Sequence, residues 1–189
     1  MDCTKQLMNV VAAVCDTPAT AGTQGQVILL PYGGIDRILS EVTDNVIKSI
    51  IMRNNAKGNT FDTLERGVLG APSLVAGTYV NSWQHDVTLR IFVKNEDVKK
   101  FVNAFTNSRV VAIVQNNEVG NAGDVMYEAY GWDAGLKLNE ATGDTTMADG
   151  LVYEITAGND DQAKERSLPK SVFITDIATT ETMLNSLVA

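Results

Sequence analysis

The stretch WQHDVTLRIFVKNEDVKKFVNAFTNSRVVAIVQ, residues 83–115, decides the fold of this chain. Side chains alternate between a mainly apolar and a polar face from Trp83 to Val93, which predicts a strand with one covered face. Asn95 is a good N-cap, and apolar residues at spacings of three and four after it predict an amphipathic helix over about 95–107. Residues 109–115 are almost wholly apolar and predict a buried strand.

Most other patterned segments also favour strands. The patterns predict strands at 26–30, 46–53, 59–64, 125–130, 134–138, 151–156 and 171–175, whereas 35–42 fit a strand or a helix. Because only one strand–helix–strand unit occurs, we expect a mainly β fold of the α+β kind, an antiparallel β-sandwich or barrel with one flanking helix. Residues 26–175 would form this domain. Residues 1–25 would be an N-terminal arm or a short helix plus linker, and residues 176–189 a C-terminal arm.

One apolar segment, residues 65–79, has no regular period. It interleaves Gly67, Gly70, Pro72 and Gly77 with Val68, Leu69, Leu74 and Val75. Glycine and proline at these positions predict a loop. Because an apolar loop is unfavourable in water, we expect it to fold under the domain or to be covered by a neighbouring subunit.

Negative charge is concentrated in one part of the chain. The net charge is −8, and residues 115–165 hold eleven acids but only Lys137 and Lys164 as bases. This balance disfavours wrapping around nucleic acid, because no basic stripe is available to contact phosphates. The apolar runs are too short to span a bilayer and no signal-peptide pattern appears, so we expect a soluble protein without a membrane partner.

No catalytic or cofactor motif is visible. The single histidine, His85, precedes Asp86 on the expected strand, so the two side chains point to opposite faces and cannot form a base–orienter pair. We expect His85 to be packed in the core or an interface. Cys3 and Cys15 lack the partners that zinc needs, and residues 144–150 lack the oxygen spacing of an EF-hand loop. We expect no metal, no cofactor and no enzymatic activity.

Two segments resemble structural proteins of Bacteroidetes phages and prophages, in particular those of the tail-tube type. One is residues 80–115, and the other contains YEAYGWDAGLKL (127–138), DGLVYEITAGND (149–160) and SLP (167–169). The resemblance implies a β-sandwich-like subunit with no chemistry of its own. Six copies would form a ring, and stacked rings would form a tube through which DNA passes. The protein would reside in the virion, assembled in the cytoplasm of a bacterial host, with other tail or neck proteins as partners.

Two groups of site residues follow from this resemblance. The assembly interface would include Val68, Leu69, Leu74, Val75, Met183 and Leu187. Acidic residues in the expected loops would line the lumen and repel DNA, namely Glu118, Asp124, Glu140, Asp144 and Asp149.

Other functions fit the same features. A head–tail adaptor, a tail terminator or a capsid-decorating protein has the same general appearance. A carbohydrate- or protein-binding β-sandwich module would use exposed aromatic residues, for which the candidates are Trp83, Trp132, Tyr127, Tyr130 and Tyr153. An enzyme would need an acidic pair such as Glu128 with Asp133 or Glu154, and a sheet rich in acids yields such pairs by chance.

Overall fold

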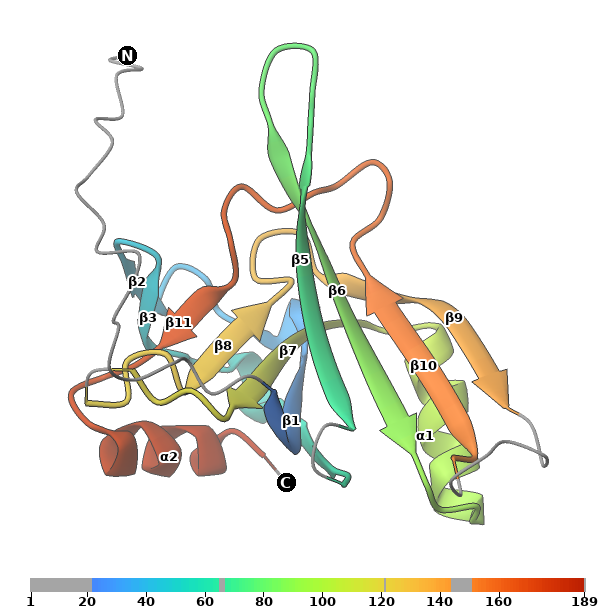
Figure 1. Cartoon of the computed structure of the whole chain (residues 1–189). Coiled ribbons are helices and arrows are strands. Elements are labelled where there is room, and N and C mark those ends of the chain that lie inside the picture. Colours follow the sequence, from blue (N-terminus) through green and yellow to red (C-terminus); the bar gives the residue numbers. More distant parts are fainter. Residues whose placement is uncertain (1–21, 65–66, 121, 144–150, 189) are drawn as a thin grey trace, which may run out of the picture.

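A computed structural model describes residues 22–64, 67–120, 122–143 and 151–188, which are mainly β structure (Figure 1). The strands are β1 (Thr23–Pro31), β2 (Glu41–Thr43), β3 (Val46–Ser49), β4 (Asn59–Asp62), β5 (Val68–Val75), β6 (Ser82–Ile91), β7 (Arg109–Asn116), β8 (Tyr127–Tyr130), β9 (Leu136–Gly143), β10 (Tyr153–Gly158) and β11 (Lys170–Val172). The helices are α1 (Glu96–Thr106) and α2 (Ile177–Ser186), and short 3-10 turns occur at Tyr32–Gly34 and Arg53–Asn55.

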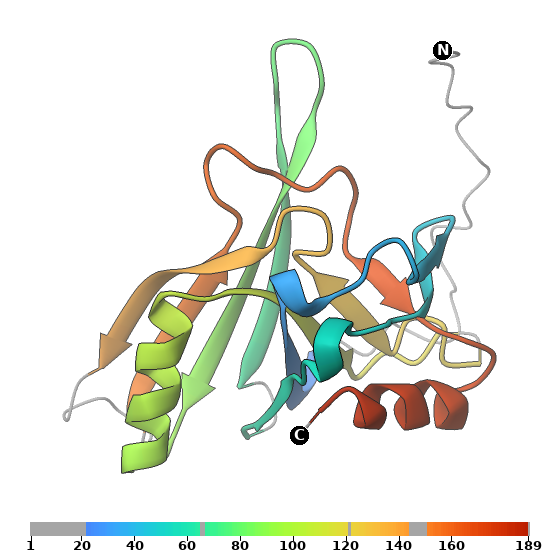
Figure 2. The ribbon, with the colours of Figure 1, turned by 180° about the vertical axis from the view of Figure 1, so that it is seen from behind.

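The strands form one mixed sheet. Its order is β2-β3-β11-β8-β7-β9-β10-β6-β5, and β1 pairs with both β7 and β4. These pairs are antiparallel except for β3 with β11. The sheet curls, and the Thr23 hydroxyl at the start of β1 donates to the Val68 carbonyl at the start of β5 at 2.5 Å (Figures 1 and 2). The expected mainly β fold with a flanking helix is confirmed, although the parallel pair was not foreseen.

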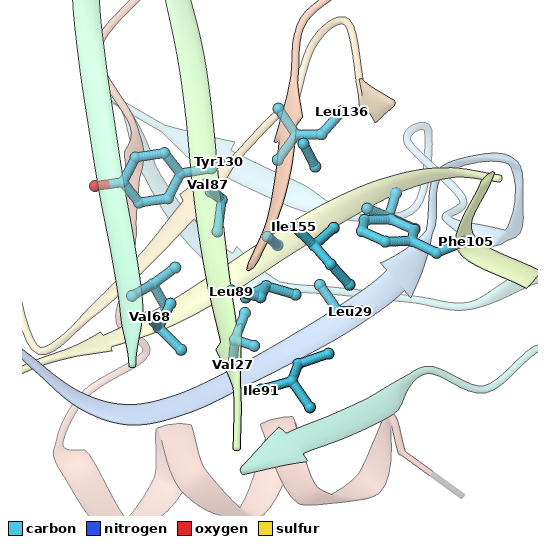
Figure 3. Close-up of a cluster of buried hydrophobic side chains, with 14 residues drawn as sticks. Val27, Leu29, Val68, Val87, Leu89, Ile91, Phe105, Tyr130, Leu136 and Ile155 are labelled. Carbon is cyan, nitrogen blue, oxygen red and sulfur yellow. The ribbon is translucent and has the colours of Figure 1, made fainter. Parts of the chain in front are cut away.

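Strands β1 and β7 separate two hydrophobic cores. Val27 and Leu29 face the first core, which also contains Val68 and the apolar face of β6 (Figure 3). The alternate residues Ile28 and Leu30 face the second core, which α2 covers. Because both faces of β1 and β7 are buried, their sequences are continuously apolar instead of alternating. This explains why both segments have the pattern of buried strands.

Helix α1 closes one side of the first core. The Asn95 side chain accepts a hydrogen bond from the amide of Val98 at 2.8 Å, as expected for an N-cap. Phe105 is buried in the first core, and Phe101 stacks on both Phe105 and Phe61, with ring centres 5.9 and 5.7 Å apart. The helix predicted over 95–107 is therefore confirmed.

The prediction of a loop at residues 65–79 is wrong, because most of this segment is the strand β5. It pairs with β6 through eight successive residues, from Val68 to Val75. The glycine and proline suit their places in this strand. The Tyr130 hydroxyl occupies the space that a Cβ on Gly70 would need. Pro72 lies on the last strand of the sheet, where a missing amide hydrogen removes no ladder hydrogen bond.

The C-terminal segment is a packed helix, so the arm expected at residues 176–189 is corrected. The Asp176 side chain caps α2 by accepting from the amide of Thr179 at 2.8 Å. Leu184 and Leu187 are buried in the second core. The apolar spacing at the C-terminus therefore marks a helix of the domain itself.

The N-terminal arm expected at residues 1–25 lies mostly outside the described residues. Strand β1 already begins at Thr23, so the end of the expected linker belongs to the sheet. The strand predicted at 46–53 is shorter, since β3 ends at Ser49 and Asn54 has a φ of 52° within the following turn.

Candidate assembly surfaces

Strands β5 and β6 form a hairpin whose apolar face continues past the first core. On this face the cross-strand pairs run outward in the order Val68–Leu89, Gly70–Val87, Pro72–His85 and Leu74–Trp83. Val68 is fully buried, whereas Leu74 is 56% exposed. Figure 1 shows the hairpin rising clear of the rest of the sheet. The face that fills the core at the base of the hairpin therefore meets solvent near its tip.

The turn of this hairpin adds two more apolar side chains. Tyr79 is 96% exposed and Val80 is 80% exposed. They lie between Gly77 and Asn81, whose side chain accepts from the Gly77 amide at 3.3 Å. Leu74, Tyr79 and Val80, which we call the hairpin tip, expose apolar surface that is unfavourable in water. An exposed cluster of this kind is typical of contact with another protein.

The free edge of β5 is poorly suited to strand addition. The amide and carbonyl of His85 both bond to Asn159, away from β5. Pro72, which is opposite His85, therefore turns its backbone to the free edge. Because proline has no amide hydrogen, an added strand would lack a donor in the middle of this edge. We expect contacts through the side chains of the hairpin tip instead.

A second exposed apolar patch lies on the turn before β2. Ile38 is 87% exposed and Leu39 is 61% exposed. The Asp36 carboxylate accepts from their two amides at 3.1 and 3.4 Å. The hydrogen bond from Arg53, with these amides, lowers the pKa of Asp36 below its usual value. The turn therefore presents two large apolar side chains on a backbone that Asp36 holds.

The six residues predicted for assembly divide between surface and core. Leu69 and Leu74 are exposed on β5, by 37% and 56%. Val68 and Leu187 are buried in the two cores, so their assignment to an interface is wrong. The other two, Val75 and Met183, are partly buried, and Met183 packs against the second core.

The two exposed patches include residues that the sequence did not mark as interface residues, namely Ile38, Leu39, Tyr79 and Val80. For Tyr79 and Val80 a signal existed, because an apolar pair stands among the turn-forming residues Gly77 and Asn81. Ile38 and Leu39 lie in a segment whose pattern fitted a strand or a helix, so nothing local marked them as exposed.

The acidic residues predicted to line a lumen do not come together. Glu118 and Asp124 lie in the loop between β7 and β8, whereas Glu140 is exposed on β9. Figures 1 and 2 show this loop beside α2 and β9 on the α1 side of the molecule. Asp144 and Asp149 lie outside the described residues. The described acidic residues that were predicted to line a lumen thus lie in two separate regions, and their role stays a prediction.

His85 is buried in a polar network beneath the hairpin, which confirms that it is a packed side chain. The amide of Gly131 donates to its Nδ1 at 3.2 Å, and its Nε2 lies 3.0 Å from the carbonyl oxygen of Ser167. Nδ1 therefore accepts while Nε2 carries the proton, which is the neutral imidazole. Burial lowers the pKa of His85, although the charge of nearby Glu165 opposes this effect.

Glu165 is the acidic member of this network and is also buried. Its carboxylate accepts from the amides of Asp133 at 2.8 Å and Ala134 at 2.9 Å, and from the side chain of Asn159 at 3.1 Å. The two amides belong to the bend between Gly131 and Gly135, whose φ angles are 74° and 77°. Glu165 therefore fixes a bend whose backbone requires glycine at both ends.

The aromatic residues considered for sugar binding do not form an exposed face. Tyr127, Tyr130 and Trp132 are buried, so this assignment is wrong for them. Burial and a neighbouring glutamate raise the pKa of both tyrosines. Trp83 and Tyr153 are half-buried.

The acids considered for catalysis each contact a donor. These contacts are Tyr130 with Glu128, Arg90 with Glu154 and Lys170 with Asp133, at 3.2, 2.8 and 3.5 Å. Each acid therefore has a partner within the fold. Among the described residues, no group of three histidine, cysteine or acidic side chains is placed to hold a metal ion.

Comparison with known proteins gives no relative. The chain matches no protein-family model, no curated protein and no solved structure. Within the described ranges, no helix has both the length and the apolar character needed to cross a membrane. A proposal about function must therefore come from the residues and their geometry.

Proposed function

We propose that this chain is a non-enzymatic, self-assembling structural protein of the kind that builds the rings of a phage tail tube. The observation that carries the proposal is the projecting β5–β6 hairpin, which exposes Leu74, Tyr79 and Val80. A neighbouring copy would cover these side chains, which are unfavourable in water. A mainly β fold with a helix beside the sheet is also what the tail-tube resemblance implies.

The second exposed patch offers the hairpin tip a partner surface. In this proposal the tip of one copy packs on Ile38 and Leu39 of the next copy. Because the two surfaces differ, the contact is head-to-tail, and its repetition closes a ring or builds a stack. Burying one such side chain contributes about 2 kcal/mol, so a stable contact needs several of them.

The charge of the chain suits a conduit for DNA. A net charge of −8 disfavours wrapping of DNA around the chain, so DNA would pass without specific binding. Other tail or neck proteins would be the further partners of the assembled rings in the virion.

Negative-stain electron microscopy and mass photometry test this proposal. We expect the purified chain to form rings or tubes of uniform width. A variant carrying Leu74→Ser, Tyr79→Ser and Val80→Ser should be a folded monomer, since all three side chains are exposed. Val93→Ser is the matched control, because Val93 is 57% exposed beyond the other end of β6 and should not affect assembly.

A monomer at every concentration, or normal rings from the triple variant, would contradict the proposal. Stacked tubes would favour the tail tube over its virion alternatives. Single rings that do not stack would favour a head–tail adaptor or tail terminator, and binding to preformed capsids would favour a decorating protein.

A further inference from the structure

A basic pocket of about 470 Å³ opens beside the bend that Glu165 fixes. Its lining includes four cationic side chains, namely Arg37, Arg109, Lys164 and Arg166. The acid among its lining residues, Asp133, lies 3.5 Å from Lys170. Four cations around one pocket stand out in a chain whose net charge is −8.

Arg37 is held in this pocket by two aromatic rings. Its guanidinium carbon lies 4.4 Å from the ring centre of Tyr32 and 5.0 Å from that of Trp132. The Tyr32 hydroxyl donates to the Asp133 carbonyl at 2.6 Å, which fixes this ring. Nη2 of Arg37 is buried and has no hydrogen-bond partner in the part of the chain that the structure describes. A buried donor without an acceptor is unfavourable, so turning this guanidinium group toward a ligand oxygen in the pocket would relieve an unfavourable state.

Two further arginines leave their donors available. Arg109 approaches Asp160 only at 3.8 Å, and Asp160 is held more closely by Lys137 at 2.5 Å. Arg166 is exposed and, across the ranges described, makes no hydrogen bond or ion pair. Both guanidinium groups can therefore turn to a ligand without breaking a strong contact.

Lys164 adds a fourth positive charge near the same space. It donates to the Gln84 side chain at 2.5 Å and lies 3.5 Å from Asp161, whose side chain is fully exposed. An ion pair with so exposed a partner is weak and screened by salt. Lys164 therefore keeps most of its attraction for an anion in the pocket.

We propose that this pocket binds a small oxyanion with two or more negative charges, and that a phosphate group is the chemistry it fits. Guanidinium groups stay charged at neutral pH, and their paired donors match the oxygens of phosphate. A singly charged anion would leave most of the positive charge unbalanced. The pocket uses no residue of the hairpin tip, so this binding is a property additional to assembly.

Calorimetric titration with inorganic phosphate tests the proposal, with chloride used to hold the ionic strength constant. We expect saturable binding of phosphate and much weaker binding of acetate. Trp132 in the pocket wall provides a second readout, because phosphate should change its fluorescence in a Trp83→Phe background that lacks the other tryptophan. Arg37→Gln and Arg166→Ala should each weaken binding by about tenfold or more, as expected when a charge-assisted hydrogen bond is lost.

Lys100→Ala is the matched control, since it removes one exposed charge from α1, outside the pocket. No saturable phosphate binding, or an equal loss of affinity in Lys100→Ala, would overturn the proposal. Because Arg166 is exposed, its variant keeps the test decisive even if Arg37→Gln fails to fold. The monomeric tip variant should bind phosphate as the natural chain does, so this result is separate from the outcome for assembly.

Discussion

Replacing Glu165 by alanine should strongly destabilise the protein. Glu165 is only 1% exposed, and its two oxygens accept hydrogen bonds from Asp133, Ala134 and Asn159 at 2.8 to 3.1 Å. The substitution removes both acceptors. It leaves the amides of Asp133 and Ala134 without a partner, whereas Nδ2 of Asn159 keeps only its hydrogen bond to the Gly135 carbonyl at 3.0 Å. Ala134 and Asn159 are themselves buried, so water reaches these donors poorly.

The expected cost follows from the two orphaned amides and the lost Asn159 contact. A buried donor that loses its acceptor costs about 1–3 kcal/mol, and the variant recovers part of this because it no longer buries a carboxylate. We therefore expect the free energy of unfolding to fall by about 3–4 kcal/mol in Glu165→Ala. Glu165→Gln keeps one acceptor oxygen but turns an NH₂ group toward the other donors, so it should lose about half as much.

Urea unfolding followed by circular dichroism measures this difference, in the variant with the three serine substitutions so that the proposed assembly would not add to stability. Asp161→Ala is the control, because the Asp161 side chain is fully exposed and should cause no measurable change. Amide hydrogen exchange at Asp133 and Ala134 should also become faster in Glu165→Ala. A loss below about 1 kcal/mol for Glu165→Ala, or equal losses for the two Glu165 variants, would refute the reasoning.

Three further predictions concern pH and the backbone. Folding lowers the pKa of His85 below its ordinary 6.5, so the unfolded chain takes up the proton first. The contribution of His85 to stability should therefore be complete above about pH 6.5 and be lost as the pH falls below this value. Thermal melts between about pH 8 and 5 measure this change. An imidazole pKa above 6.5, measured by NMR, would contradict the prediction. Gly131→Ala should lower the free energy of unfolding in urea by about 2 kcal/mol, because φ is 74° and the new Cβ would lie 2.5 Å from Cγ of Leu136. Gly33→Ala is the control and should be neutral, because its Cβ would meet nothing within 4 Å. Asn95→Ala should cost about 1 kcal/mol by the same assay through loss of the α1 cap, and an unchanged stability would argue against that cap.

Local patterns correctly predicted the elements whose periodic side chains and caps are close together in the sequence. The alternation in β6 and the cap and apolar stripe of α1 each span about a dozen residues, and both elements were found. Strand β5 was missed because its glycine and proline are explained only by distant partners. Gly70 lies beneath the Tyr130 hydroxyl, and Pro72 suits its position only because β5 ends the sheet. The parallel pairing of β3 with β11 likewise depends on segments far apart in the chain.

The candidate surfaces were predictable only where local sequence marks them. Residues 65–79 are apolar but contain glycine and proline, and such a segment is unfavourable in water. The sequence therefore predicted that Leu69 and Leu74 lie in an interface. Nothing in the sequence says how far the hairpin extends past the core, and this distance alone separates the buried Val68 from the exposed Leu74. The basic pocket was invisible to the sequence because Arg37 and Arg166 come from opposite ends of the domain.

Hydrogen bonds connect the buried polar network of His85 and Glu165 to the exposed β5–β6 hairpin. The main chain of Glu165 exchanges two hydrogen bonds with Trp83, each of 2.9 Å, and the His85 amide donates to the Asn159 side chain at 2.7 Å. Trp83 and His85 lie where β6 leaves the first core. Strand β5 cannot supply this support, because from Leu69 outward its free edge pairs with no strand in the described ranges. In the assembly that we propose, a hairpin tip held in place would lose less conformational entropy on contact, so the polar network would favour that contact by fixing the hairpin in advance.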